Sequence, residues 1–430
     1  ALADHPTVKG ILLPVENQPA VAEAYTKWDR GNPCDPYLAN QVAGAIRQVV
    51  QNYFSDYFRT LKYVVIVGSD AIIPFHRVPD DSYIANESLY YSQAGLSRDN
   101  ATEAALDLGY ILTDDGYGDL RRLSWRGREL FVPDLAVGRL VESPDEISQM
   151  VIHYLERGSE LTPKSALSTG YDFLIDSGTA IRDTLIARGL PTQSLIHDRW
   201  LDTALEAAWL EVRRDIASLN AHFDHNEAIP PAGLQTTTAK EVAEARADMA
   251  GSVNFSMGCH SGYNVFDKHA LPATELDYPQ ALAQKQAWWV GNTGFGYGMD
   301  DSVAYTERLM HLFGQHLTSQ ANMPVGLALV RAKQQYLSQA TSGGFGTYDE
   351  KVLVESTLYG LPMYQVSVPK PAPWTRSETP GAAVAPANTT PKIAANQELH
   401  IEYRSLSFDY DPVHMTKRGR FYTIDGQAQA

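Results

Sequence analysis

At 430 residues the chain is too long for one ordinary core, and we expect two or three domains. An apolar share of 44% with 20% charged residues excludes a disordered chain, and no apolar run approaches the roughly 20 residues of a membrane span. The net charge of −16, without a stripe rich in Lys and Arg, argues against nucleic acid as a partner. Two cysteines, Cys34 and Cys259, exclude a disulfide scaffold and a four-cysteine zinc site.

Strands and helices alternate along the first 158 residues. Apolar spacing and turn residues predict a buried strand, a helix, a short β-branched strand ending at Gly68, a loop with an acidic end, an extended stretch and a second helix. In that order they are Val8–Val15, Pro36–Phe58, Tyr63–Val67, Asn100–Gly118, Leu130–Val137 and Pro144–Arg157. The second helix has Ser143 as a predicted N-cap, with Pro144 first and Glu146 third.

The same alternation continues after Pro163. The predicted strands are Ala166–Tyr171, Ile216–Phe223, Gly251–Met257, Ala287–Val290 and Met363–Val368, and the predicted helices are Ser177–Gly189, Thr203–Val212, Ala304–Leu317 and Val325–Leu337. Strands that alternate with helices favour an α/β fold with mostly parallel sheets. Residues 370–397, rich in Pro, Ala and Thr, are predicted to be a linker, and residues 398–430 a fragment of a β-rich module.

Cys259 is the first candidate for chemistry. It follows the predicted strand Gly251–Met257 and the glycine after it, Gly258, and open α/β sheets build their sites at the carboxyl ends of parallel strands. His225 follows the preceding predicted strand, so imidazole and thiol should meet at one edge of the sheet. An imidazole there can take the proton of the thiol and return one to a leaving amine.

Two other interpretations of these residues remain open. Cysteine is often an inert core residue. His222 and His225 could instead bind a metal with Cys259 or His260, which would make the protein a zinc hydrolase. Histidines three residues apart on a strand point to opposite faces, however, and the glutamate of the metalloprotease helix signature is absent.

Several segments resemble the gingipain family of cysteine peptidases. These are Tyr63–Asp70 with Ile73-Pro74, Pro133–Leu140, Asn220–Asn226, Phe255–Gly262 and Leu358–Pro362, which occur in the family's order. The resemblance spans roughly Val8 to Pro369. It implies two caspase-like three-layer α/β/α subdomains, residues 1–158 and 159–369, and a secreted or cell-surface endopeptidase, with Cys259 as nucleophile and His225 as its partner.

The resemblance also implies roles for residues around the dyad. Glu142 stands where the family places the acidic residue that orients the histidine. The backbone N–H groups of Cys259 and Asn226 are expected to form the oxyanion hole. Asp224 and Asn226 replace the two glycines that flank the family's histidine, so a catalytically degenerate surface or binding domain is the alternative function.

The segment after the nucleophile strand is expected to line the substrate pocket. The predicted pocket residues are Trp289, Asn292, Thr293, Gly294, Tyr297 and Asp300. Asp300 or Asp301 could pair with a basic substrate side chain, which gives a hypothesis of cleavage after basic residues.

No cofactor is expected for the chemistry itself. Asp114, Asp115 and Asp119 cluster among glycine turns, a pattern that suits a structural Ca²⁺ ion, which gingipain relatives carry. The expected partner is a protein or peptide substrate. Because Ala1 begins the sequence without a leader, we also expect the chain to come from a longer precursor.

Overall fold

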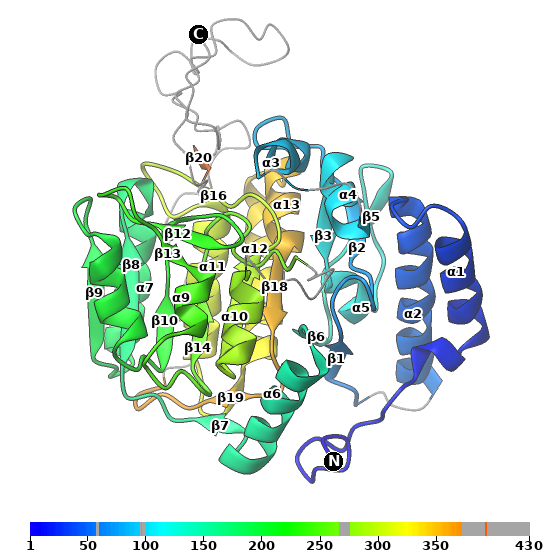
Figure 1. Ribbon diagram of the computed structural model, residues 1–430, viewed down its shortest axis with the longest axis horizontal. Helices are drawn as coiled ribbons and strands as arrows, with labels where there is room; N and C mark the ends of the chain where they lie inside the picture. Colours follow the sequence, from blue (N-terminus) through cyan, green and yellow to red (C-terminus); the bar gives the residue numbers. More distant parts are fainter. Residues whose placement is uncertain (57–59, 95, 97–99, 266–275, 372–391, 394–430) are drawn as a thin grey trace, which may run out of the picture.

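One eight-stranded sheet runs through the computed structural model (Figure 1), which describes residues 1–56, 60–94, 96, 100–265, 276–371 and 392–393. Its strand order is β1-β6-β18-β15-β14-β10-β8-β9. Their bounds are β1 Tyr63–Val67, β6 Ala136–Leu140, β8 Ala166–Gly170, β9 Thr192–Ile196, β10 Ile216–Ser218, β14 Val253–Phe255, β15 Trp288–Asn292 and β18 Ser356–Tyr359. The fold is α/β with a mostly parallel sheet, as the alternating pattern predicts.

The sheet consists of two parallel halves. Strands β15, β14, β10, β8 and β9 are parallel to one another, and so are β1, β6 and β18. The halves join where β15 pairs antiparallel with β18. β6 and β14 therefore run in opposite directions, and their carboxyl ends lie at opposite ends of the strands of the sheet.

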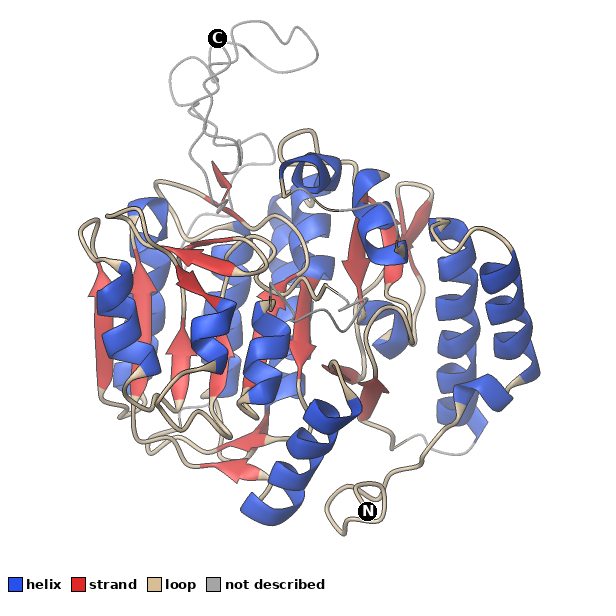
Figure 2. Ribbon diagram, viewed as in Figure 1, coloured by secondary structure: helices blue, strands red, loops and turns tan. Residues whose placement is uncertain are grey.

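Helices cover both faces of the sheet (Figure 2). One core contains Val253, Phe255 and Met257 of the β14 segment with α11 and α12, while the other contains Ala217 and Trp289 with α9 and α10. The helices are α1 Pro19–Arg30, α2 Pro36–Asp56, α3 Glu87–Gln93, α4 Ala101–Asp107, α5 Asp115–Gly118, α6 Pro144–Arg157, α7 Ile175–Ala187, α8 Asp202–Leu205, α9 Ala239–Ala243, α10 Tyr278–Gln284, α11 Tyr305–Leu317, α12 Val325–Gly343 and α13 Thr347–Glu355. Among the described residues, none of these helices is long and apolar enough to cross a membrane.

Short strands and turns complete the described structure. They are η1 Val15–Asn17, β2 His76–Pro79, β3 Tyr110–Thr113, β4 Leu123–Trp125, β5 Arg128–Leu130, β7 Glu160–Leu161, η2 Asp172–Leu174, the π-helical η3 Glu206–Leu210, β11 His222–Phe223, β12 Glu227–Ile229, β13 Thr237–Thr238, β16 Tyr297–Gly298, β17 Met323–Pro324, β19 Gln365–Val366 and β20 Lys392–Ile393. Strands β11, β12 and β13 form a small antiparallel sheet beyond the end of β10.

Strands from both predicted subdomains lie in the one large sheet. β1 and β6 precede residue 158, and β18 beside them comes from the second part of the chain. The division at residue 158 stays a prediction, although hydrogen bonds cross it.

Local signals in the sequence were sufficient for several elements. α2 begins at Pro36, β1 spans Tyr63–Val67, and α6 has the predicted bounds. The predicted cap of α6 is also present, because Ser143 accepts from the Glu146 backbone N–H and the Glu146 carboxylate accepts from Ser143.

Other predicted elements were wrong. Residues 8–14 form no strand, and the Leu12 side chain is 80% exposed, because none of the described strands pairs with this apolar run. The predicted loop Asn100–Gly118 contains α4, β3 and α5. The predicted strand Ile216–Phe223 breaks after Ser218, and its end joins the small sheet as β11.

Three more differences concern the later half of the chain. The predicted helix Thr203–Val212 ends as the π-helical turn η3. Within the predicted final strand, only Gln365–Val366 is β structure. β18, which was not predicted, lies between β6 and β15 in the large sheet. Most of the predicted linker and all of residues 398–430 lie outside the described residues, but Lys392–Ile393 forms β20, which pairs with β16.

Candidate active site

The segments that carry His225 and Cys259 pack against each other. β10 and β14 are parallel neighbours with Ser218 opposite Phe255, and both chains continue past the same edge. A Cβ atom at Gly258 would lie 2.4 Å from Cδ2 of the Phe223 ring. The residue before the cysteine therefore touches the residue two positions before the histidine, and glycine is required there by this close approach.

His225 lies in the turn between β11 and β12. Asp224 holds this turn, because its Oδ1 accepts from the backbone N–H groups of Asn226 at 2.9 Å and Glu227 at 2.8 Å. Asp224, His225 and Asn226 are not among the described residues with positive φ, so the residues that replace the family's glycines are unstrained. The N–H predicted to serve the oxyanion hole from Asn226 is engaged with Asp224 in this structure.

The Cys259 side chain is fully buried. Its thiol donates to the carbonyl oxygen of Gly296 at 3.6 Å. Burial raises the pKa of the Cys259 thiol well above its ordinary value, and the nearby Glu355 and Glu87 act in the same direction. This environment therefore disfavours the thiolate form of Cys259.

The His225 ring packs against two tyrosines of the hydrophobic core. The His225 ring is edge-on to Tyr90 and Tyr263, with centroid distances of 6.0 and 5.9 Å. Those two tyrosines belong to the same hydrophobic cluster as Cys259. Tyr90 Oη also lies 2.5 Å from His225 Nδ1 and accepts from the His225 backbone N–H at 3.1 Å.

The residue after the cysteine connects the site to a buried charge network. His260 Nε2 lies 2.7 Å from Glu87 Oε2, and Lys351 Nζ lies 2.6 Å from Glu87 Oε1 and 2.7 Å from Asp80 Oδ2. Burial would raise the pKa of Glu87, but Lys351 and His260 outweigh it and hold the pKa at about 2. Burial lowers the pKa of His260, against the effect of Glu87.

Sequence reasoning missed this network together with α3. Residues 80–94 received no predicted element, although Asn86 is a favourable N-cap and does accept from the Ser88 backbone N–H. Asn86 followed by Glu87 and then Tyr90 was the signal that could have revealed the helix. No local pattern indicates that Lys351, more than 250 residues away, meets Glu87.

Glu142 lies on another part of the site. Its Oε2 accepts from Asn264 Nδ2 at 3.2 Å, and the same amide donates to Asp277 Oδ2 at 2.9 Å. Burial, and then the charge of Glu142, raise the pKa of Asp277 well above its ordinary value. The His225 carbonyl accepts from the Tyr278 N–H at 2.9 Å, so Asn264 and the start of α10 link Glu142 to the histidine turn.

The residues predicted to line a substrate pocket are mostly buried in structural contacts. Trp289 Nε1 donates to the Ser261 carbonyl, and Asn292 Nδ2 donates to that of Met257. Thr293 Oγ1 donates to the Leu112 carbonyl, and Tyr297 Oη to that of Ile84. Gly294 is close to Glu87 Oε1, whereas Asp300 is exposed.

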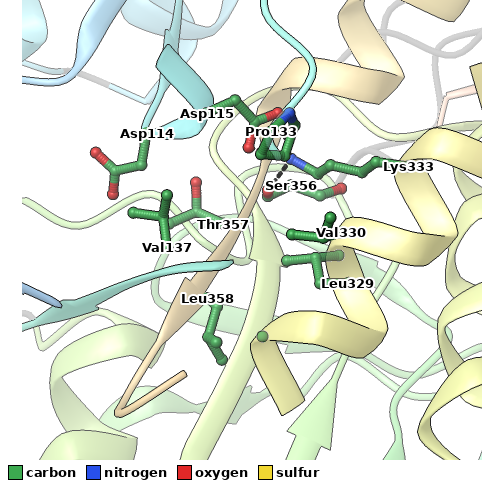
Figure 3. Close-up of a pocket in the computed structure, with 11 residues that line it drawn as sticks. Asp114, Asp115, Pro133, Val137, Leu329, Val330, Lys333, Ser356, Thr357 and Leu358 are labelled. Atoms are coloured by element: carbon green, nitrogen blue, oxygen red, sulfur yellow. Dashed lines mark hydrogen bonds and ion pairs between the residues drawn. The ribbon is translucent and has the colours of Figure 1, made fainter. Parts of the chain in front are cut away.

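Each predicted calcium ligand has a different partner. Asp114 forms a two-point ion pair with Arg139, and Lys333 Nζ contacts both oxygens of Asp115 at 2.7 and 2.6 Å (Figure 3). Asp114, Asp115 and Lys333 line a cavity of about 10 Å³, room for about one water molecule. Asp119 accepts from the Arg121 N–H. Within the described ranges no cluster of three or more His, Cys, Asp or Glu side chains has the arrangement of a metal site.

The model of Peptidase family C25 matches residues 20–367, most of the chain. The chain belongs to peptidase family C25. This is the gingipain family of cysteine peptidases, as the resemblance implies. None of the curated proteins compared with this C25 chain matches it.

Two solved gingipain structures share the fold. One is described as the Arg-specific cysteine proteinase gingipain R (RgpB), with a TM-score of 0.55, 13% identity, and coverage of 82% of this chain and 76% of the other. The second is a complex of Porphyromonas gingivalis RgpB pro- and mature domains, with a TM-score of 0.54, 15% identity, and coverage of 83% and 79%. At these identities the likeness concerns the fold of the C25 chain alone.

Proposed function

We propose that this C25 chain is an endopeptidase in which Cys259 is the nucleophile and His225 its acid–base partner. The observation that carries the proposal is the contact between Phe223 and Gly258, which packs the two segments together in a chain of a cysteine peptidase family. The shared core around Cys259 and the His225 ring supports the same assignment.

The proposed reaction has two steps. Cys259 Sγ attacks the peptide carbonyl carbon while its proton goes to His225, and the C–N bond then breaks as His225 gives that proton to the leaving amine. Water, deprotonated by His225, attacks the thioester and releases the carboxylic acid and the thiol. Glu142 is proposed to stabilise the imidazolium, acting through Asn264 and the start of α10.

The oxyanion hole is proposed to use the N–H groups of Cys259 and Asn226. Because the Asn226 N–H donates to Asp224 in this structure, Asp224 must give up that hydrogen bond in the reacting complex. The buried Cys259 must likewise become accessible, so the proposal includes a movement of the residues that cover it.

A peptide backbone already pairs beside the proposed nucleophile. β20, Lys392–Ile393, pairs antiparallel with Tyr297–Gly298, and these residues directly follow Gly296, the acceptor of the Cys259 thiol. An extended substrate could pair with the same edge through its main chain. This supports a polypeptide as the substrate.

Specificity for basic side chains is the proposed preference at this site. Asp300 lies near Asp176, whose pKa is raised mainly by burial, and Asp176 contacts Glu307. Asp300 is exposed and lies two residues after β16, where its carboxyl group would attract a substrate cation. A peptide library cleaved without preference for Arg or Lys, or an unchanged preference in Asp300→Asn, would overturn this part.

The test of the main proposal compares Cys259→Ala and His225→Ala with Cys34→Ala on a broad peptide library. We expect the first two variants to lose cleavage by at least a thousandfold and Cys34→Ala to retain it. Cleavage that survives in Cys259→Ala would refute the assignment. Glu142→Gln should lower kcat by about tenfold or more and leave KM similar.

A non-catalytic binding domain is the second candidate, and the burial and raised pKa of Cys259 favour it. The rate of thiol alkylation separates the two functions. An active site should give a Cys259 that reacts much faster than a denatured-state thiol near neutral pH, whereas a structural Cys259 should react only as the protein unfolds.

We further propose that the chain is exported and matures from a longer precursor, by analogy with the RgpB pro- and mature-domain complex. Immunoblots of culture medium, cell surface and cell interior should show the 47.5-kDa chain outside and a larger form inside. A single form confined to the cell interior would contradict this. A structural Ca²⁺ ion also stays a proposal, which equal melting temperatures with calcium and with chelator would refute.

A further inference from the structure

Helix α3 is fixed at its first residue. The Glu87 backbone N–H donates to Asp80 Oδ2 at 2.9 Å, and the Glu87 carboxylate is fully buried between Lys351 and His260. The Phe295 N–H also donates to Glu87 Oε1 at 3.0 Å. Four residues from separate segments of the chain therefore hold the start of this short helix.

Tyr90 lies one turn after Glu87, on the same face of α3. Its ring stacks on the His260 ring with a centroid distance of 3.3 Å and an interplanar angle of 7°. Phe295 and Tyr263 contact it edge-on, and Tyr90 is fully buried. The position of its hydroxyl group is thus set by packing rather than by the hydroxyl's own hydrogen bonds.

Within the described part of the chain, the hydroxyl of Tyr90 makes two hydrogen-bond contacts, both with His225. Oη accepts from the backbone N–H at 3.1 Å and lies 2.5 Å from Nδ1. Burial raises the pKa of Tyr90 well above its ordinary value, so the phenol keeps its proton. If the phenol donates that proton to Nδ1, the hydroxyl is satisfied both as a donor and as an acceptor. If Nδ1 carried a proton instead, the buried O–H would have no acceptor among the contacts of the described chain.

We propose that Tyr90 is a positioning residue for His225: it fixes the orientation of the ring and the tautomer in which neutral His225 carries its proton on Nε2. The contribution of Tyr90 to catalysis rests on the proposed peptidase function, whereas the predicted tautomer of His225 does not. Because a hydrogen bond donated to Nδ1 stabilises the neutral ring, Tyr90 should lower the pH at which His225 takes up a second proton.

Other titratable groups also surround His225. Asp224 lies in its own turn, Tyr263 and His260 follow β14, and Tyr278 begins α10. Tyr263 provides the matched control, because it is also buried edge-on to the His225 ring but its hydroxyl has no hydrogen-bond partner within the described residues. Tyr263→Phe therefore removes the same chemical group as Tyr90→Phe but does not remove a contact to Nδ1 of His225.

The experiment is ¹⁵N NMR of histidine-labelled protein, with the His225 signal assigned by its loss in His225→Ala. We expect the Nε2–H tautomer in the wild type and in Tyr263→Phe, and a mixture of tautomers in Tyr90→Phe. The midpoint of the His225 titration should rise by about one pH unit in Tyr90→Phe alone. An Nδ1–H tautomer in the wild type, or identical spectra for the two variants, would overturn the proposal.

Kinetics give a second measurement on the same proteins. In the Nε2–H tautomer only Nδ1 can take the proton of Cys259, so the Tyr90 hydroxyl has to leave Nδ1 in the reacting complex. In Tyr90→Phe we expect the acid limb of kcat/KM to move to higher pH by about one unit with KM nearly unchanged, while Tyr263→Phe behaves as the wild type. A wild type that cleaves no peptide but shows the Nε2–H tautomer would refute the peptidase function and support the role of Tyr90. Equal kinetics and equal tautomers in both variants would refute that role.

Discussion

Replacing Gly258 with alanine tests the contact that brings the candidate dyad together. The new Cβ would lie 2.4 Å from Cδ2, 2.7 Å from Cγ and 2.8 Å from Cβ of Phe223. Ordinary contact begins near 3.4 Å, so Phe223 has to move by about 1 Å. Phe223 is 1% exposed, and its neighbours leave the ring little room to retreat.

Two effects of Gly258→Ala follow from this displacement. Overpacking a buried contact should lower the free energy of unfolding by about 1–3 kcal/mol. Because His225 is two residues beyond Phe223, a shift of about 1 Å should misalign the imidazole and reduce kcat/KM by about 100-fold. Urea denaturation measures the first effect and peptide cleavage the second.

Gly44→Ala is the matched control. Gly44 is exposed in α2, and a Cβ there would meet nothing within 4 Å. Alanine should therefore stabilise the protein by about 0.5–1 kcal/mol through helix propensity and leave cleavage unchanged. If Gly258→Ala also unfolds and cleaves as the wild type does, the two segments are not packed as described, and the structural argument for the dyad fails.

Two further predictions concern buried charge. Burial lowers the pKa of His76 from 6.5 to about 3, so at pH 5 the folded protein keeps His76 neutral while the unfolded chain protonates it. The free energy of unfolding should therefore fall by about 2 kcal/mol from pH 7 to pH 5. In urea titrations, His76→Phe should lose that part of the pH dependence. An unchanged slope in His76→Phe would contradict this. Lys333→Met should destabilise the protein by about 3–5 kcal/mol, because Asp115 loses its buried partner, and adding Asp115→Asn should recover much of the loss in thermal melts. Recovery of Lys333→Met by calcium alone would instead support a cation site at Asp115.

Short-range chemistry explains what the sequence determined by itself. Ser143, Pro144 and Glu146 are sufficient to start α6 at the right residue, because a capping box satisfies backbone N–H groups within one turn. The alternation of strands and helices indicates the mostly parallel sheet, and Gly258 before Cys259 marks the end of a strand. The order of five family-like segments was enough to predict membership of the gingipain family.

Long-range packing decided the rest. β18 comes late in the chain yet pairs with both β15 and β6. Because β18 is antiparallel to β15 and parallel to β6, β6 runs in the direction opposite to β14. Glu142, which follows β6, contacts Asn264 of the segment after Cys259. The direction of a strand in the sheet depends on neighbouring strands that are distant in sequence, and no local pattern indicates which strands these are.

The charge network around the candidate dyad has the same origin. Lys351 meets Glu87 and Asp80 because α13 and α3 both pack against β3. Tyr90 reaches His225 across 135 positions of sequence. Spacing and propensity act over a few residues, whereas a buried ion pair or a shared hydroxyl forms only when distant segments are brought together by the common core. The sequence therefore determined which residues are candidates for the chemistry, and the tertiary structure decided which neighbours surround them.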